Sequence, residues 1–142
     1  MKKLNGTSII EVIIATALIN VAVLSALSLI NRSQNQNIYA RNLAEANKYS
    51  TQVADWIRQE RETLGWATLS AKCSGTCTYC LNDIPPSFTD LTEGSCTDTI
   101  TNTFSRTVTM TKNTDSLLFT INTTWVDKTI KAASLEMELR QW

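Results

Sequence analysis

The sequence contains no histidine, and its 142 residues include only four glycines and two prolines. Without histidine, the chain lacks the side chain that most often acts as a general base near neutral pH. The few glycines form no phosphate-binding loop, no nucleophile elbow is present, and the carboxylates do not cluster at metal-binding spacing. We therefore predict a protein that is not an enzyme and that needs no cofactor or metal ion.

A surplus of charge of either sign is also missing. Thirteen basic residues balance 13 acidic ones, so the formal net charge is zero. Non-specific binding to nucleic acid depends on an excess of basic side chains that neutralise phosphates. We do not expect nucleic acid as a partner.

The most prominent feature that is present is an apolar run from Ile9 to Ile30. The run has about 22 residues, which would form a helix about 33 Å long, enough to cross a bilayer core of about 30 Å. Lys2 and Lys3 precede the run, and the positive-inside rule places them in the cytoplasm and the rest of the chain outside. No small-residue cleavage site follows the run, so we expect the helix to remain in the mature protein.

Glu11 lies inside this apolar run, where a carboxylate costs about 3 kcal/mol even on the gentler insertion scales. If the chain is cut after Gly6, the new amine of Thr7 lies one helical turn from Glu11. That amine is able to pair with the carboxylate of its own chain or of a neighbouring copy, which would make Glu11 an assembly residue. The alternative is that Glu11 lies at the cytoplasmic interface and reaches water.

The basic leader, Gly6, the short hydroxyl-containing segment that starts at Thr7, Glu11 and the long apolar helix together resemble the N-terminal signal of type IV prepilins and pseudopilins. The resemblance implies that prepilin peptidase cuts after Gly6, that the amine of Thr7 is then methylated, and that Glu11 is needed for filament assembly. Thr7 replaces the phenylalanine usual in this family, and no proline bends the apolar helix. Both departures favour a minor pilin or a pseudopilin over a major pilin.

The function implied by this resemblance is that of a structural minor pilin subunit of a type IV pilus. Its partners would be other pilin subunits, major and minor, the prepilin peptidase, the inner-membrane assembly platform and, before assembly, membrane lipid. The protein would first span the inner membrane once, with its C-terminal domain extracytoplasmic, and then enter a surface filament. The alternatives are a pseudopilin of a type II secretion or competence apparatus, and a membrane-anchored binding domain that never polymerises.

A second helical pattern follows the apolar run. Residues 31–64 contain neither proline nor glycine, and apolar side chains recur there at three- and four-residue steps or their sums. The recurring positions are Tyr39, Leu43, Ala46, Val53 and Ile57. Such a stripe predicts an amphipathic helix that continues the membrane segment as far as Gly65, a typical helix C-cap residue.

Residues 66–103 contain many threonines and serines, the pair Pro85-Pro86 and all four cysteines, Cys73, Cys77, Cys80 and Cys96. This composition predicts a long connecting loop. An even number of cysteines in a small extracytoplasmic domain favours two disulfides, for which three pairings are possible. The alternatives are a tetrathiolate zinc site, for which only the Cys77–Cys80 interval fits, and redox catalysis by the same pair. In pilins, this region varies between members and contacts partners.

The last third of the sequence alternates apolar and polar residues. It predicts three antiparallel strands joined by turns at residues 112–115 and 127–128. We therefore expect an α+β fold in which a long N-terminal helix, membrane-spanning in its first half and amphipathic in its second, packs on a small antiparallel β-meander. Pilins and pseudopilins share this arrangement. The expected parts are a leader (1–6), a transmembrane and assembly helix (7–30), an amphipathic helix (31–65), a cysteine-containing loop (66–103) and a sheet (104–142).

Overall fold

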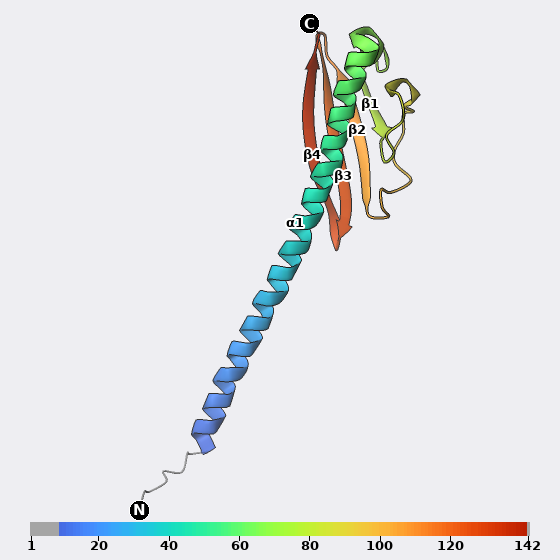
Figure 1. The fold of residues 1–142 in the computed structure, drawn as a ribbon. Helices are drawn as coiled ribbons and strands as arrows, with labels where there is room; N and C mark the ends of the chain where they lie inside the picture. The colour runs from blue at the N-terminus through green and yellow to red at the C-terminus, as the bar shows by residue number, and fades with distance from the viewer. Residues whose placement is uncertain (1–8, 142) are drawn as a thin grey trace, which may run out of the picture. The chain divides into compact units, whose positions relative to one another are not determined.

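A computed structural model describes residues 9–141 of the chain (Figure 1). The elements are α1 (Ile9–Ala71), β1 (Thr76–Cys80), the 3-10 helix η1 (Phe88–Asp90), β2 (Phe104–Lys112), β3 (Ser116–Asp127) and β4 (Thr129–Arg140). The chain divides between Tyr39 and Ala40 into two compact units, and α1 contributes to both. The predicted cleavage position at Gly6 and Thr7 lies outside the described residues.

The first unit, as far as it is described, consists of the N-terminal part of α1. Its sequence from Ile9 to Ile30 is predominantly apolar and free of glycine and proline, the residues that most strongly disfavour a helix. The large apolar side chains are exposed on every side of this segment, with exposed fractions from 51% to 80%. A helix that is apolar all round requires an apolar environment or neighbouring helices.

The second unit is an antiparallel sheet covered on one face by α1. The strands lie in the order β1-β2-β3-β4, each hydrogen-bonded to the next along the chain, which is a meander. Figure 1 shows the C-terminal part of α1 crossing one face of this sheet. The expected α+β fold, a long helix packed on an antiparallel meander, is therefore confirmed.

The core of the second unit lies between α1 and the sheet. Ala46, Val53 and Ile57 on α1 are fully buried, which confirms the predicted stripe, although Tyr39 at its start is 40% exposed. Alternate residues of the strands face them because side chains in a strand point to opposite faces in turn. The buried strand residues include Val108, Met110, Leu117, Phe119, Ile121, Trp125, Met137 and Leu139.

The sheet has one strand more than the sequence pattern indicates. Residues Thr76–Cys80, expected to be loop, form β1 and pair with β2 in a register that places Tyr79 opposite Val108. Tyr79 is buried, and threonine and tyrosine favour strands. Tertiary pairing thus makes a strand of five residues that are too few to show a clear alternation.

The helix α1 also continues beyond its expected end. Gly65 has φ 77° and ψ 163°, a non-helical conformation that glycine adopts readily, but the chain then resumes the helix and ends it at Ala71. Leu69 is fully buried in the core and Trp66 packs against it. These contacts anchor the additional turns, so the glycine marks a kink and not the end of the helix.

Candidate assembly helix and cystine loop

The apolar part of α1 is a candidate membrane span. Among residues 9–141 it is the one helix long and apolar enough to cross a bilayer, and the mean hydropathy of its best 18-residue window is 2.4, with none of that window buried. Exposed apolar surface on this scale is unfavourable in water. The segment therefore calls for lipid, for other helices, or for both in turn.

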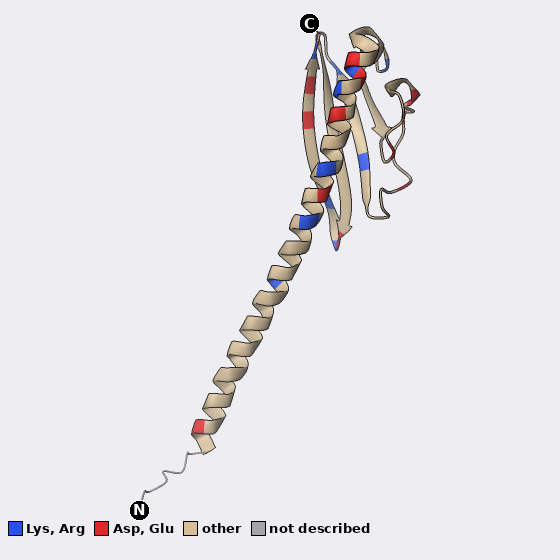
Figure 2. Ribbon diagram, in the orientation of Figure 1, with Lys and Arg blue, Asp and Glu red and all other residues tan. Residues whose placement is uncertain are grey.

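Glu11 interrupts this apolar surface. It is exposed near the start of the described helix, and no other charged residue follows it until Arg32, so the ribbon between them is uncharged (Figure 2). Within residues 9–141, its carboxylate makes no hydrogen bond or ion pair. Thr7, the residue expected to supply a partner amine, lies outside the described residues.

Two hydroxyls in the same segment are satisfied locally. The Thr16 hydroxyl donates to the carbonyl of Ile13 at 2.9 Å, and the Ser25 hydroxyl donates to the carbonyl of Val21 at 2.8 Å. Such bonds to the preceding helical turn satisfy a hydroxyl without any neighbouring chain. Glu11 therefore differs from these groups in still needing a partner once the helix is in a membrane.

All four cysteines form disulfides, which confirms the expectation. Cys73 pairs with Cys77, and Cys80 pairs with Cys96, with Cα–Cα distances of 6.0 and 4.9 Å. One bridge closes the turn between α1 and β1, and the other ties the end of β1 to the irregular segment before β2. Because every sulfur is bonded to another, no thiolate is available for the zinc or redox alternatives in this state.

A buried arginine organises the segment between these strands. Arg106 on β2 is 2% exposed, and its guanidinium donates to the carbonyl oxygens of Leu81 at 2.6 Å, Tyr49 at 2.7 Å and Asn82 at 3.3 Å. The arginine thus joins α1, β2 and the start of the loop. Burial lowers the pKa of Arg106 to about 10, and the nearby Asp83 carboxylate acts against that shift. The side chain remains protonated at neutral pH.

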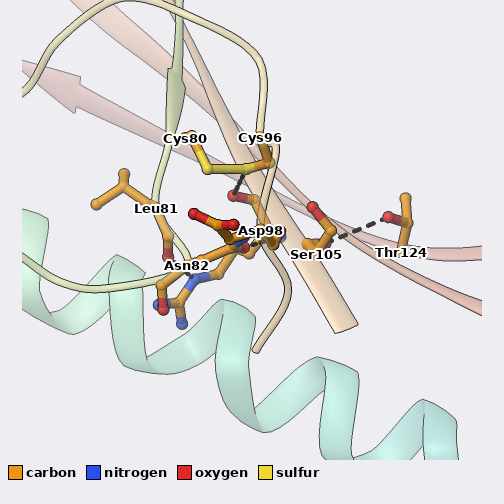
Figure 3. The surroundings of a disulfide bond; sticks show 8 residues. Cys80, Leu81, Asn82, Cys96, Asp98, Ser105 and Thr124 are labelled. Atoms are coloured by element: carbon orange, nitrogen blue, oxygen red, sulfur yellow. Dashed lines mark hydrogen bonds between the residues drawn. A yellow bond between two sulfur atoms is a disulfide. The ribbon is translucent and has the colours of Figure 1, made fainter. Parts of the chain in front are cut away.

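The backbone around Arg106 holds the second disulfide in place. Figure 3 shows Leu81 and Asn82 beside the Cys80–Cys96 bridge. The side-chain oxygen Oδ1 of Asn82 accepts a hydrogen bond from the backbone amide of Arg106 at 2.7 Å. The side-chain nitrogen Nδ2 of Asn82 donates to the backbone carbonyl of Asp98. The Cys96 sulfur lies 3.2 Å from the Arg106 carbonyl oxygen. Residues from both sides of the loop therefore meet at one point on β2.

A buried glutamate fixes the middle of the loop to α1. Glu60 is 8% exposed, and its carboxylate accepts from the Phe88 amide at 2.6 Å and from the Ser87 hydroxyl at 3.3 Å. The Phe88 ring enters the core, 5.8 Å from the Trp56 ring and 6.2 Å from the Phe119 ring between centroids. The loop is thus anchored by disulfides, by Arg106 and by Glu60. Residues 92–99, apart from the half-buried Cys96, remain exposed.

The roles of Arg106 and Glu60 were not predicted, although their positions in the strand and helix patterns indicate burial. Arg106 occupies an inward position of the β2 alternation, between Phe104 and Val108. Glu60 follows Ile57 by three residues and so continues the buried stripe of α1. A charged residue at an inward position predicts a buried charge with specific partners. The partners themselves lie on irregular segments whose path the sequence does not reveal.

No family model, no curated protein and no solved structure shows significant similarity to the chain.

Proposed function

We propose that this protein is a structural minor pilin subunit of a type IV pilus, cut after Gly6 and assembled through its N-terminal helix. The observation that carries the proposal is Glu11, an exposed carboxylate without a partner among residues 9–141, inside an apolar helix in which the Thr16 and Ser25 hydroxyls bond to their own backbone. A charge in such a position normally faces a specific partner. The helix-on-meander domain agrees with the same proposal.

In the proposed mechanism, cleavage creates the amine that Glu11 lacks. The ammonium of Thr7 lies four residues from Glu11, about one helical turn. When subunits pack in the filament, the carboxylate of an incoming subunit pairs with the amine of a neighbour. The pair offsets the cost of a lone carboxylate in an apolar environment, so subunits in the correct axial register are favoured over others.

The rest of the apolar helix serves two environments in turn. In the membrane, lipid covers its exposed side chains, and in the filament other helices replace the lipid. Because lipid tails are as apolar as leucine, the exchange has little hydrophobic driving force of its own. Packing and the Glu11 pair must then provide the preference for the filament. The second unit is displayed on the outside, with the exposed residues on either side of Cys96, 92–95 and 97–99, available to partners.

The Glu11→Gln variant tests this function. Glutamine keeps the size of the side chain and removes the charge, so membrane insertion should persist while incorporation into filaments falls by at least about tenfold, the equivalent of about 1.4 kcal/mol. Incorporation is measured as the ratio of this chain to the major subunit in sheared filaments. Glu62→Gln, which alters an exposed carboxylate in the second unit, is the matched control and should incorporate normally.

Normal incorporation of Glu11→Gln would remove the role assigned to this residue. An uncut N-terminus, together with absence of the chain from filaments whichever residue occupies position 11, would favour an anchored domain that never polymerises. A pseudopilin would show the same cleavage and the same dependence on Glu11. Its location within the envelope, and not on surface filaments, would distinguish it.

A further inference from the structure

Two aliphatic side chains are exposed at the turn between β3 and β4. Val126 is 72% exposed and Ile130 is 78% exposed. Within residues 40–141 they are the large apolar side chains that lie mostly in solvent. They pair directly across the two strands, so they lie side by side on the same face. We call residues 126–130 the hairpin tip. Together the pair forms a small apolar patch at the end of the β3–β4 hairpin.

The position of the hairpin tip within the second unit is defined by the core beneath it. Trp125, directly before the tip, belongs to a buried cluster with Ala46 and Phe104, and Leu43 packs against that cluster. The hairpin tip therefore lies at the end of the sheet where α1 enters the second unit, opposite the end that carries the C-terminus (Figure 1).

The chain itself keeps this end of the sheet near a membrane. Only nine residues lie between Ile30, the last residue of the apolar run, and Ala40, the first of the second unit. The ten steps from Ile30 to Ala40 cover about 15 Å as a helix and at most about 35 Å when fully extended. While the apolar helix spans the membrane, a lipid surface therefore lies within this distance of the second unit. No other apolar partner is guaranteed to lie so close.

The charges around the patch also suit a lipid surface. Lys128 forms the turn with a φ of 57° and is exposed, and Lys131 follows on β4, while Asp127 is the acidic residue between Val126 and Lys131. Residues 126–131 therefore have a net charge of +1, and the exposed Arg41 adds another positive charge at the start of the second unit. Apolar side chains flanked by basic ones are typical of segments that enter the headgroup region of anionic membranes.

We propose that the hairpin tip inserts shallowly into the headgroup region of the membrane that holds the apolar helix of the same chain. Val126 and Ile130 enter the boundary between headgroups and acyl chains, and the lysines remain at the level of the phosphates. The contact forms while the subunit is still in the membrane, before assembly. It rests on the membrane-spanning part of the proposed function and not on filament formation. It would steady the second unit on the membrane and would have to be released when the subunit leaves the membrane.

The test uses the full chain reconstituted in vesicles of phosphatidylethanolamine and phosphatidylglycerol whose acyl chains are brominated near the headgroup. Ile130→Trp places a fluorophore at the hairpin tip, and Ser134→Trp, on the same face of β4, is the matched control. The control residue lies about 13 Å further along the strand. Quenching of the unmodified chain, with its own tryptophans, is subtracted from both.

We expect the tryptophan at position 130 to be quenched at least about twofold more than that at position 134, and less so when Val126→Ser is added or when phosphatidylglycerol is omitted. Equal quenching of the two variants would overturn the proposal. A tryptophan at position 130 that is shielded from an aqueous quencher but untouched by bromine would also overturn it, in favour of a contact between subunits. N-terminal processing is measured separately, so failure of the pilin proposal would be recognised independently.

Discussion

The two units of this chain treat polar groups inside apolar surroundings in opposite ways. In the second unit, Arg106 and Glu60 are buried but fully engaged with backbone groups of the same unit. In the described part of the first unit, Glu11 has no such partner, and the apolar side chains around it are exposed. The buried charges of the second unit are therefore satisfied within that unit, whereas the exposed apolar surface of the first requires lipid or other chains. The difference indicates which part of the chain depends on its surroundings.

Removing the buried arginine should have the largest effect on the second unit. Arg106→Met should lower the free energy of unfolding of the second unit by about 3–5 kcal/mol, because it leaves three carbonyl groups without their donor. Chemical unfolding of the full chain in detergent, followed by tryptophan fluorescence, measures the loss. Arg58→Met is the control: its pair with Asp55 is exposed, so it should change stability by no more than about 0.5 kcal/mol. A similar small effect at position 106 would contradict the role of Arg106.

The two disulfides offer a graded test of the same unit. In the chain-entropy model, the Cys80–Cys96 bridge, with a sequence separation of 16, contributes about 3 kcal/mol, and the Cys73–Cys77 bridge, with a separation of 4, about 2 kcal/mol. We expect replacement of Cys80 and Cys96 by serine to destabilise the second unit more than replacement of Cys73 and Cys77 by serine. The same unfolding measurement gives both values, and the reverse order would show that loop closure does not govern the stability of this region.

A smaller change isolates the anchor in the middle of the loop. Glu60→Ala removes the acceptor of the Phe88 amide and should cost about 1–3 kcal/mol, whereas Glu60→Gln keeps an acceptor oxygen and should recover most of that loss. Hydrogen exchange at the Phe88 amide reports the contact directly and should accelerate in the alanine variant. Glu62→Ala, at an exposed neighbouring position, should leave that exchange rate unchanged. Unchanged exchange in Glu60→Ala would mean that the carboxylate does not hold the loop.

Much of the fold could be predicted from the sequence because its strongest signals are local. The apolar run, the stripe through Ala46, Val53 and Ile57, and the alternation in β2, β3 and β4 each extend over many residues. Periodicity is most reliable in such long segments. The presence of two disulfides likewise followed from the number of cysteines and the expected extracytoplasmic location.

The features that escaped prediction depend on contacts between distant residues. The five residues of β1 become a strand by pairing with β2, and the helix passes Gly65 because Leu69 reaches the core. The disulfide pairing was open among three possibilities, since cysteine spacing alone does not determine it. Arg106 was placed in the correct alternation, but its three backbone partners lie on α1 and on the loop after β1. For the assembly site, Gly6 and Thr7 remain predictions that need a measurement on the mature protein.

That measurement is mass spectrometry of the N-terminal peptide of the protein isolated from its own membranes or filaments. We expect a peptide that begins at Thr7, with or without a methyl group on its amine, because cleavage after Gly6 creates the positive charge that Glu11 needs. A peptide that begins at Met1 or Lys2 would contradict the proposed function. Glu11 would then have no amine one turn away, and the protein would be an anchored domain whose function has to be sought at the cystine loop.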